Sequence, residues 1–85
     1  MTEKIIKVLK AAFHCHHLEV IDESRQHAGH AEAKQSGGGH YIVNIVADEF
    51  RGKSHLQRHR MVNDALKSLR GGIHALALTT KAPGE

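Results

Sequence analysis

Histidine is the residue type whose number and spacing point to chemistry in this sequence. The chain holds nine histidines among 85 residues. An imidazole binds transition metals such as iron, copper and zinc, and an unperturbed one changes charge near pH 6.5. These side chains can therefore bind a metal, make partner binding depend on pH, or serve only as hydrogen-bonding groups.

One stretch, "HAGHAEAKQSGGGH" at 27–40, carries three of these histidines, His27, His30 and His40, together with four glycines, three of them consecutive. Residues 25–39 connect two predicted strands, and this connection is longer than the two to five residues of a common hairpin loop. The stretch fits a metal-binding loop, a nucleic-acid contact or a flexible connection, and its own residues do not choose among the three.

A second stretch, "HCHH" at 14–17, places four potential metal ligands in a row. Adjacent residues of a strand point to opposite faces, whereas a closed zinc site needs four convergent ligands. No second Cys/His pair has zinc-ligand spacing, so a closed structural zinc site is not expected. Cys15 is the single cysteine and cannot form an internal disulfide, which suits a reducing compartment.

Two further histidines fall at the edges of predicted apolar faces. His74 opens a strand and shares its face with Leu76 and Leu78, while His59 lies at the margin of a helical apolar stripe. From the residues alone, a hydrogen-bonded structural role is favoured for both. Loop histidines and a strand histidine could also converge on a metal, but two imidazoles cannot close a tetrahedral site, so a partner would have to supply the remaining ligands.

Catalysis is not expected. The sequence has no Walker-type phosphate loop and no paired catalytic carboxylates, and so small a domain offers Cys15 no cleft in which a base could activate it.

The elements that position these residues follow from apolar periodicity and from turn and cap signals. Thr2 can cap the first helix, and Ser54 and Gln57 have the spacing of a capping box at the start of the long one. Gly71 and Gly72 end that long helix. The predicted elements are a helix over 3–13, strands over 18–24 and 40–48, a short helical turn over 48–51, a helix over 55–70 and a strand over 73–80.

This order, α-β-β-α-α-β, predicts an α+β fold in which a three-stranded sheet carries its helices on one face. The length allows one domain, 1–85, with a variable hairpin loop at 25–39 and a flexible tail at 81–85. No apolar run approaches the roughly 20 residues of a membrane span, and the first residues do not resemble a signal peptide. We therefore expect a cytoplasmic protein without a membrane segment.

The charge balance permits contact with nucleic acid but does not require it. Lys and Arg exceed Asp and Glu by three. On a continuous helix, Lys53, Arg60 and Lys67 would lie on one line opposite the apolar face, with Arg70 close by and Asn63 able to reach a base edge. A simple solvated face is the favoured alternative. The few aromatic residues argue against capture of single-stranded bases by stacking.

Five motifs in order, "LEVIDES", "HY", "FRGKS", "LQRHRMV" and "IHALAL", resemble the BolA family over nearly the whole chain. The resemblance implies a fold similar to class II KH domains. It also implies partnership with a monothiol glutaredoxin, in which a [2Fe–2S] cluster is shared between the glutaredoxin cysteine, glutathione and two BolA side chains. For some bacterial members it implies DNA-binding regulation of the stress response and cell shape.

Carried over residue by residue, the resemblance makes His74 of the "H-A-L" motif one cluster ligand and His27 the second, with His30 as the competing loop candidate. His59 matches a typical family position and keeps its structural interpretation. The cluster is expected only in a heterodimer with glutaredoxin, and the isolated chain is expected to be a monomer without cofactor. Because "FRGKSH" holds a single glycine, a GXXG-type RNA clamp is not expected, whereas duplex DNA remains the alternative partner.

Overall fold

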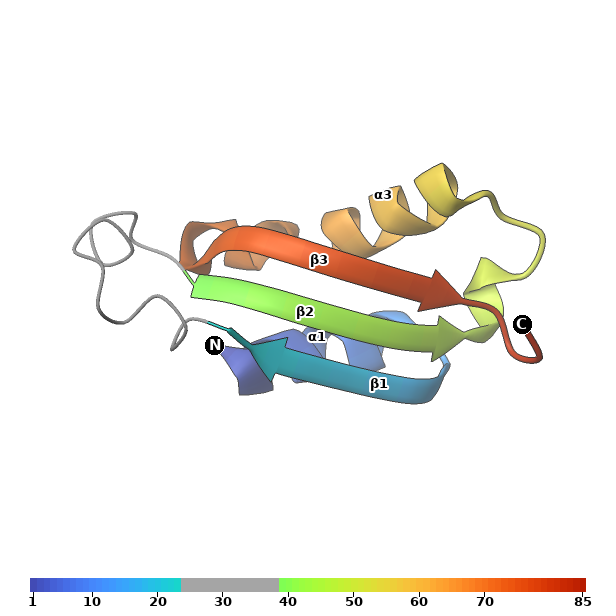
Figure 1. Ribbon diagram of the computed structural model, residues 1–85, viewed down its shortest axis with the longest axis horizontal. Coiled ribbons are helices and arrows are strands. Elements are labelled where there is room, and N and C mark those ends of the chain that lie inside the picture. The colour runs from blue at the N-terminus through green and yellow to red at the C-terminus, as the bar shows by residue number, and fades with distance from the viewer. Residues whose placement is uncertain (24–38) are drawn as a thin grey trace.

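The computed structural model describes residues 1–23 and 39–85, and it confirms the predicted α+β fold. A 3-10 turn, η2, takes the place of the short helical turn, and a second 3-10 segment, η3, precedes the last strand (Figure 1). The elements in chain order are α1 (Thr2–Ala12), β1 (Cys15–Asp22), β2 (Gly39–Ala47), η2 (Asp48–Phe50), α3 (His55–Ala65), η3 (Lys67–Gly72) and β3 (Ile73–Lys81).

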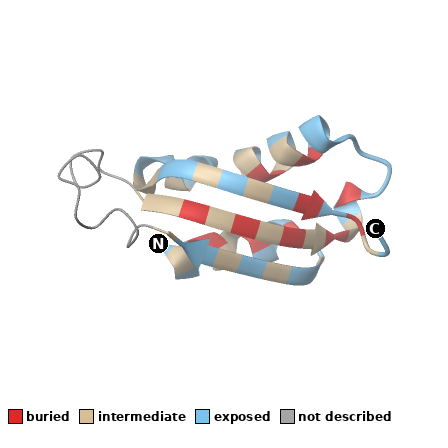
Figure 2. Cartoon of the chain, viewed as in Figure 1, coloured by how far each residue is buried: buried red, intermediate tan, exposed pale blue. Residues whose placement is uncertain are grey.

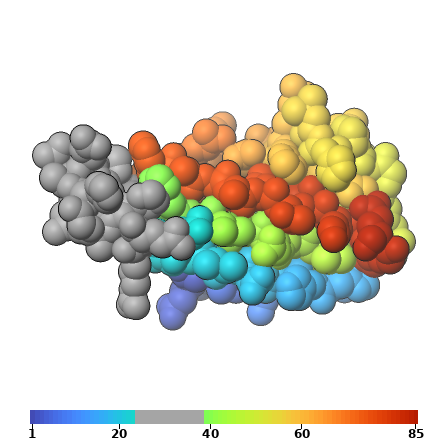
Figure 3. Space-filling model, in the orientation of Figure 1, coloured from blue at the N-terminus to red at the C-terminus, as the bar shows by residue number. Residues whose placement is uncertain are grey.

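The three strands form one mixed sheet in the order β1-β2-β3. β1 and β2 are antiparallel, as predicted for a hairpin, whereas β2 and β3 are parallel. A parallel pair needs a crossover connection, which η2, α3 and η3 supply. α1 and α3 both lie behind the sheet in Figure 1, and the space-filling view shows the strands exposed on the near face (Figure 3).

The core lies between this sheet and the two helices. Alternate residues of β2 are buried and those between them are half-buried, as expected when one face of a strand packs on helices (Figure 2). The helices contribute apolar residues spaced three or four apart, which share one helical face. The core includes Ile5 and Leu9 from α1, Tyr41, Val43, Ile45 and Ala47 from β2, Phe50 from η2, Val62 from α3 and Leu66 after it.

Both predicted helices differ from the expectation at one end. Thr2 does not cap α1, because it is the first residue inside the helix and Met1 holds the cap position without a side-chain bond. The long helix does not reach Arg70: α3 ends at Ala65, and the amide of Leu69 donates to the carbonyl of Leu66 at 2.9 Å, the i+3 bond of a 3-10 turn. The capping box is confirmed, since Ser54 and Gln57 exchange bonds of 2.9 and 3.1 Å.

The chain end is held by an ion pair that the sequence did not indicate. Arg58 of α3 is only 5% exposed, and its guanidinium donates to both carboxylate oxygens of Glu85, at 2.6 and 2.8 Å. The same carboxylate accepts the amide of Ala82 at 3.0 Å. The Arg58 bonds, followed by the Ala82 bond, lower the pKa of Glu85 to about 2. Residues 81–85 were expected to form a flexible tail, and Glu85 at their end is thus bound to α3 through Arg58.

Candidate functional site

His74 lies at the end of the sheet where β2 begins, and its side chain is exposed. The pairing of β2 with β3 steps from Gly39–Ile73 to His40–Ala75, so His74 has no Cα partner in the register. Such an irregularity inserts an extra residue into one strand and redirects its side chain. The strand geometry therefore presents this imidazole at the sheet end and keeps it out of the regular ladder.

His40 lies beside it. The ring centroids of His40 and His74 are 5.1 Å apart, with the ring planes inclined by 38°. The sequence predicts for His40 only a place at the start of its strand. The proximity depends on the parallel register between β2 and β3, which no local sequence pattern encodes, so the sequence offered no signal for this pair.

A hollow of about 220 Å³ lies next to His74 on the helix side of the sheet. Leu76 packs against the core and lines this hollow together with His74. His74 therefore lies beside the buried face of β3, as the sequence predicts. The lining residues are Asn63, Leu66, Arg70, Ile73, His74 and Leu76.

His27 and His30, the two loop candidates, lie outside the described residues. Within residues 1–23 and 39–85, no group of three His, Cys, Asp or Glu side chains is arranged to hold a metal ion. A metal centre at His74 would therefore need ligands from the loop, from a partner, or from both.

The residues suggested for nucleic-acid contact are spread over several elements. Lys53 lies before α3, since the helix begins only after Ser54, whose backbone is extended. Arg60 lies inside α3 and Lys67 lies in η3. All three side chains are exposed, but they do not follow one continuous helix. Asn63 and Arg70 instead line the hollow with His74. His59 is half-buried, in agreement with its structural interpretation, and its backbone carbonyl accepts a hydrogen bond of 2.9 Å from the side-chain Nδ2 of Asn63.

The sequence profile of the family described as BolA-like protein matches residues 9–85. The chain belongs to the BolA-like family. It is 49% identical to an uncharacterised protein from Sinorhizobium, described by its position in the cobS 5' region, over 100% of this chain and 94% of that protein. It is 42% identical to the DNA-binding transcriptional regulator BolA of Escherichia coli, over 92% of this chain and 71% of the relative.

Solved structures agree with the family assignment. The BolA domain of SufE1 from Arabidopsis thaliana superimposes with a TM-score of 0.79 at 39% identity, covering 96% of this chain and 91% of that domain. The BolA-like fold, with a sheet open on one side, is therefore shown by sequence and by structure. None of the helices in the described ranges is long and apolar enough to cross a membrane.

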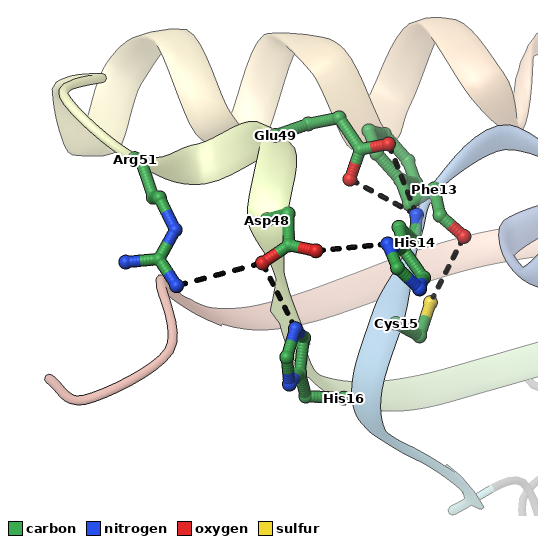
Figure 4. Close-up of polar contacts among 7 residues, drawn as sticks. All are labelled: Phe13, His14, Cys15, His16, Asp48, Glu49 and Arg51. Carbon is green, nitrogen blue, oxygen red and sulfur yellow. Dashed lines mark hydrogen bonds and ion pairs between the residues drawn. The ribbon is translucent and has the colours of Figure 1, made fainter.

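Two histidines of the "HCHH" run in this BolA-like chain contact the carboxylate of Asp48 (Figure 4). The rings of His14 and His16 contact the two oxygens of Asp48, through Nδ1 at 2.8 Å and Nε2 at 2.9 Å. Arg51 adds a longer contact of 3.5 Å. The hydrogen bond from His16 is the main cause that lowers the pKa of Asp48. These contacts tie the start of β1 to η2.

Cys15 lies within the same run but faces the protein interior. Its thiol is directed to the carbonyls of Leu9 and Phe13, both at 3.7 Å, and burial is the main cause that raises its pKa. Because the thiolate is the reactive and metal-binding form, this environment disfavours both reactions at neutral pH.

Proposed function

We propose that this BolA-like chain is an accessory protein of iron–sulfur metabolism that binds a monothiol glutaredoxin and shares a [2Fe–2S] cluster with it. His74 would be one ligand and a loop histidine, His27 or in reserve His30, the other. The observation that supports this most directly is the exposed imidazole of His74, which the irregular step in the β2–β3 pairing presents beside His40. An exposed, incomplete ligand set suits a metal group whose remaining ligands come from a partner.

The side chains present are chemically suited to such a cluster. Imidazole nitrogen binds iron, and histidine in place of thiolate raises the reduction potential of a [2Fe–2S] centre. When bound, the cluster would supply one-electron redox chemistry and transferable iron and sulfide. The contribution of this chain would be to hold the imidazole of His74 in place at the sheet end. Since only the deprotonated ring binds metal, acid should weaken the shared site.

Anaerobic reconstitution of the chain with a monothiol glutaredoxin, iron, sulfide and glutathione tests this proposal. The visible absorption and circular dichroism of the mixture should differ from those of the glutaredoxin cluster alone. His74→Ala should restore the spectrum of the glutaredoxin cluster. His27→Ala and His30→Ala, measured in parallel, decide which loop histidine is the second cluster ligand.

His17→Ala is the matched control, because His17 is also exposed but pairs with Val46 at the opposite end of the sheet. It should leave the mixed spectrum unchanged. The proposal fails if His74→Ala gives the same heterocomplex spectrum as the wild type. The proposal further includes a cytoplasmic chain that is monomeric alone, pairs one-to-one with the glutaredoxin and catalyses no reaction itself.

Duplex DNA is the second candidate partner, supported by the exposed cations at Lys53, Arg60 and Lys67. The E. coli relative carries the name of a DNA-binding transcriptional regulator. If DNA binds this surface, affinity should fall steeply with salt, because each neutralised phosphate releases counterions. Charge reversal at Arg60 and Lys67 should reduce the salt slope by about one per lost contact. Binding that does not respond to salt would exclude this surface.

A further inference from the structure

Arg70 follows the early end of α3 and lies in η3. On a continuous α-helix this side chain would lie close to the line of Lys53, Arg60 and Lys67 and, seven residues after Asn63, on nearly the same side as Asn63. The chain instead passes Leu66 and continues as η3, which turns by about 120° per residue and no longer by about 100°. Arg70 lines the hollow at the sheet end together with Asn63 and His74, which come from α3 and β3.

The lining of this hollow includes a positively charged side chain and no negatively charged one. Arg70 is exposed and makes no ion pair or hydrogen bond within residues 1–23 and 39–85, unlike Arg58, whose two terminal nitrogens donate to Glu85. None of the lining residues is acidic. An unpaired guanidinium presents several donors in a planar fork that matches a carboxylate or a phosphate. A bound group is therefore expected to be anionic.

The floor of the hollow selects among anions. Leu66, Ile73 and Leu76 supply apolar surface, which an inorganic ion cannot use. Leu66 is also the C-terminal cap of α3, and the partial negative charge at a helix C-terminus weakens the binding of any anion, so contacts with the apolar surface have to contribute to binding. A ligand with one acidic group and an apolar body meets the guanidinium and the floor at the same time.

The volume sets the scale of that ligand. The hollow measures about 220 Å³, whereas an apolar cavity of roughly 150 Å³ is known to hold a benzene molecule. A six-membered ring or a branched aliphatic chain with one carboxylate fits this size.

We propose that the hollow is a binding site for small organic carboxylates, with the carboxylate on Arg70 and the apolar body on Leu66, Ile73 and Leu76. The site requires neither iron nor glutaredoxin. Because His74 lines the same hollow, an occupant would lie beside the proposed cluster ligand. The same chemistry could come from a free carboxylic acid or from the terminal carboxylate of a peptide.

Titration of the isolated, isotope-labelled chain followed by NMR tests the site without any metal. Benzoate represents a free acid, N-acetyl-leucine represents a peptide terminus, and benzamide is the neutral analogue of benzoate. At least one carboxylate should cause saturable shifts at the side-chain signals of Arg70, Asn63 and His74. Benzamide should bind at least tenfold more weakly than benzoate if benzoate is the ligand that binds. The carboxylate that binds more tightly shows whether the site prefers a free acid or the terminal carboxylate of a peptide.

Variants at the two arginines separate a specific site from general charge. Arg70→Gln should weaken binding at least tenfold, and Arg70→Lys should give an intermediate loss because it keeps the charge without the fork. Arg51→Gln, at an exposed arginine between η2 and α3 and outside the lining, should leave carboxylate binding unchanged. Circular dichroism melting checks that each variant is folded. The proposal is overturned if neither carboxylate binds, if phosphate causes the same shifts, or if Arg70→Gln binds as the wild type does.

Cluster reconstitution and carboxylate titration use different reagents and different readouts. Loss of cluster sharing would leave the carboxylate site intact, and an empty hollow would leave the cluster proposal intact.

Discussion

His40 and His74 lie side by side across the parallel pair of β2 and β3, with ring centroids 5.1 Å apart. The two residues are 34 positions apart in sequence, and only the crossover through α3 and η3 brings them together. This contact restricts the directions in which the exposed ring of His74 can point. His40 is therefore a positioning residue for the proposed ligand.

Substitution of His40 should loosen the proposed cluster site without removing a ligand. Outer partners of metal ligands typically contribute 10- to 100-fold in affinity, so His40→Ala should speed loss of iron from the heterocomplex to a chelator by about tenfold. The rate is followed by the decay of visible absorption. His17→Ala should decay at the wild-type rate. Equal rates for His40→Ala and the wild type would show that the ring contact does not support the site.

The parts of the fold that could be predicted are those with a local physical signal. The alternation in β2, the helical stripe of α1 and the capping box at Ser54 each depend on neighbours within a few residues. The hairpin between β1 and β2 followed from the same patterns. These signals were sufficient for the fold class and for the place of His74 at a strand start.

The parts that could not be predicted depend on distant residues. The register that brings His40 to His74 and the ion pair of Arg58 with Glu85 join residues 34 and 27 positions apart. The break after α3 also lacked a signal, because the residues up to Arg70 keep a helical pattern. Arg70, expected close to the basic line, lies in η3 after this break and lines the hollow beside His74.

The carboxylate of Asp48 should stabilise the fold in a pH-dependent manner. Its folded-state pKa is lowered, first by the hydrogen bond from His16, so its contribution is present above the ordinary aspartate pKa of about 4 and is lost as the pH falls below it. Asp48→Asn should lower Tm at pH 6 by a few degrees. The difference from the wild type should shrink towards pH 3.

Thermal melts between pH 3 and pH 7 measure this difference. Asp64→Asn is the control, since Asp64 is exposed on α3 and its side chain makes no ion pair in the part of the chain described. A constant difference between Asp48→Asn and the wild type across this range would contradict the assignment.

The ion pair of Arg58 with Glu85 should respond differently to loss of either partner. Glu85→Gln leaves the buried guanidinium without its counter-charge and should lower Tm, whereas Arg58→Met replaces that guanidinium by an apolar side chain of similar length and should be much less destabilising. Because the pKa of Glu85 is lowered from 4.5 to about 2, its contribution is present above pH 4.5 and disappears between pH 4.5 and 2.

Denaturant melts of both variants at pH 7 and pH 3 check this asymmetry. At pH 7 the order of stability should be wild type, Arg58→Met, Glu85→Gln. If Glu85→Gln is as stable as the wild type at pH 7, the contact of residues 81–85 with α3 does not contribute to folding.

Two leucines on different helices test the placement of the core. Leu9 is fully buried between α1 and the sheet, whereas Leu56 on α3 is 61% exposed. Leu9→Ala removes buried methyl groups and leaves a cavity, so the free energy of unfolding should fall by about 2–5 kcal/mol. Leu56→Ala should change it by less than about 0.5 kcal/mol, because an exposed side chain away from such features contributes little. Urea denaturation followed by circular dichroism gives both values, and a loss at Leu56 as large as that at Leu9 would show that α3 packs on the sheet through a different face.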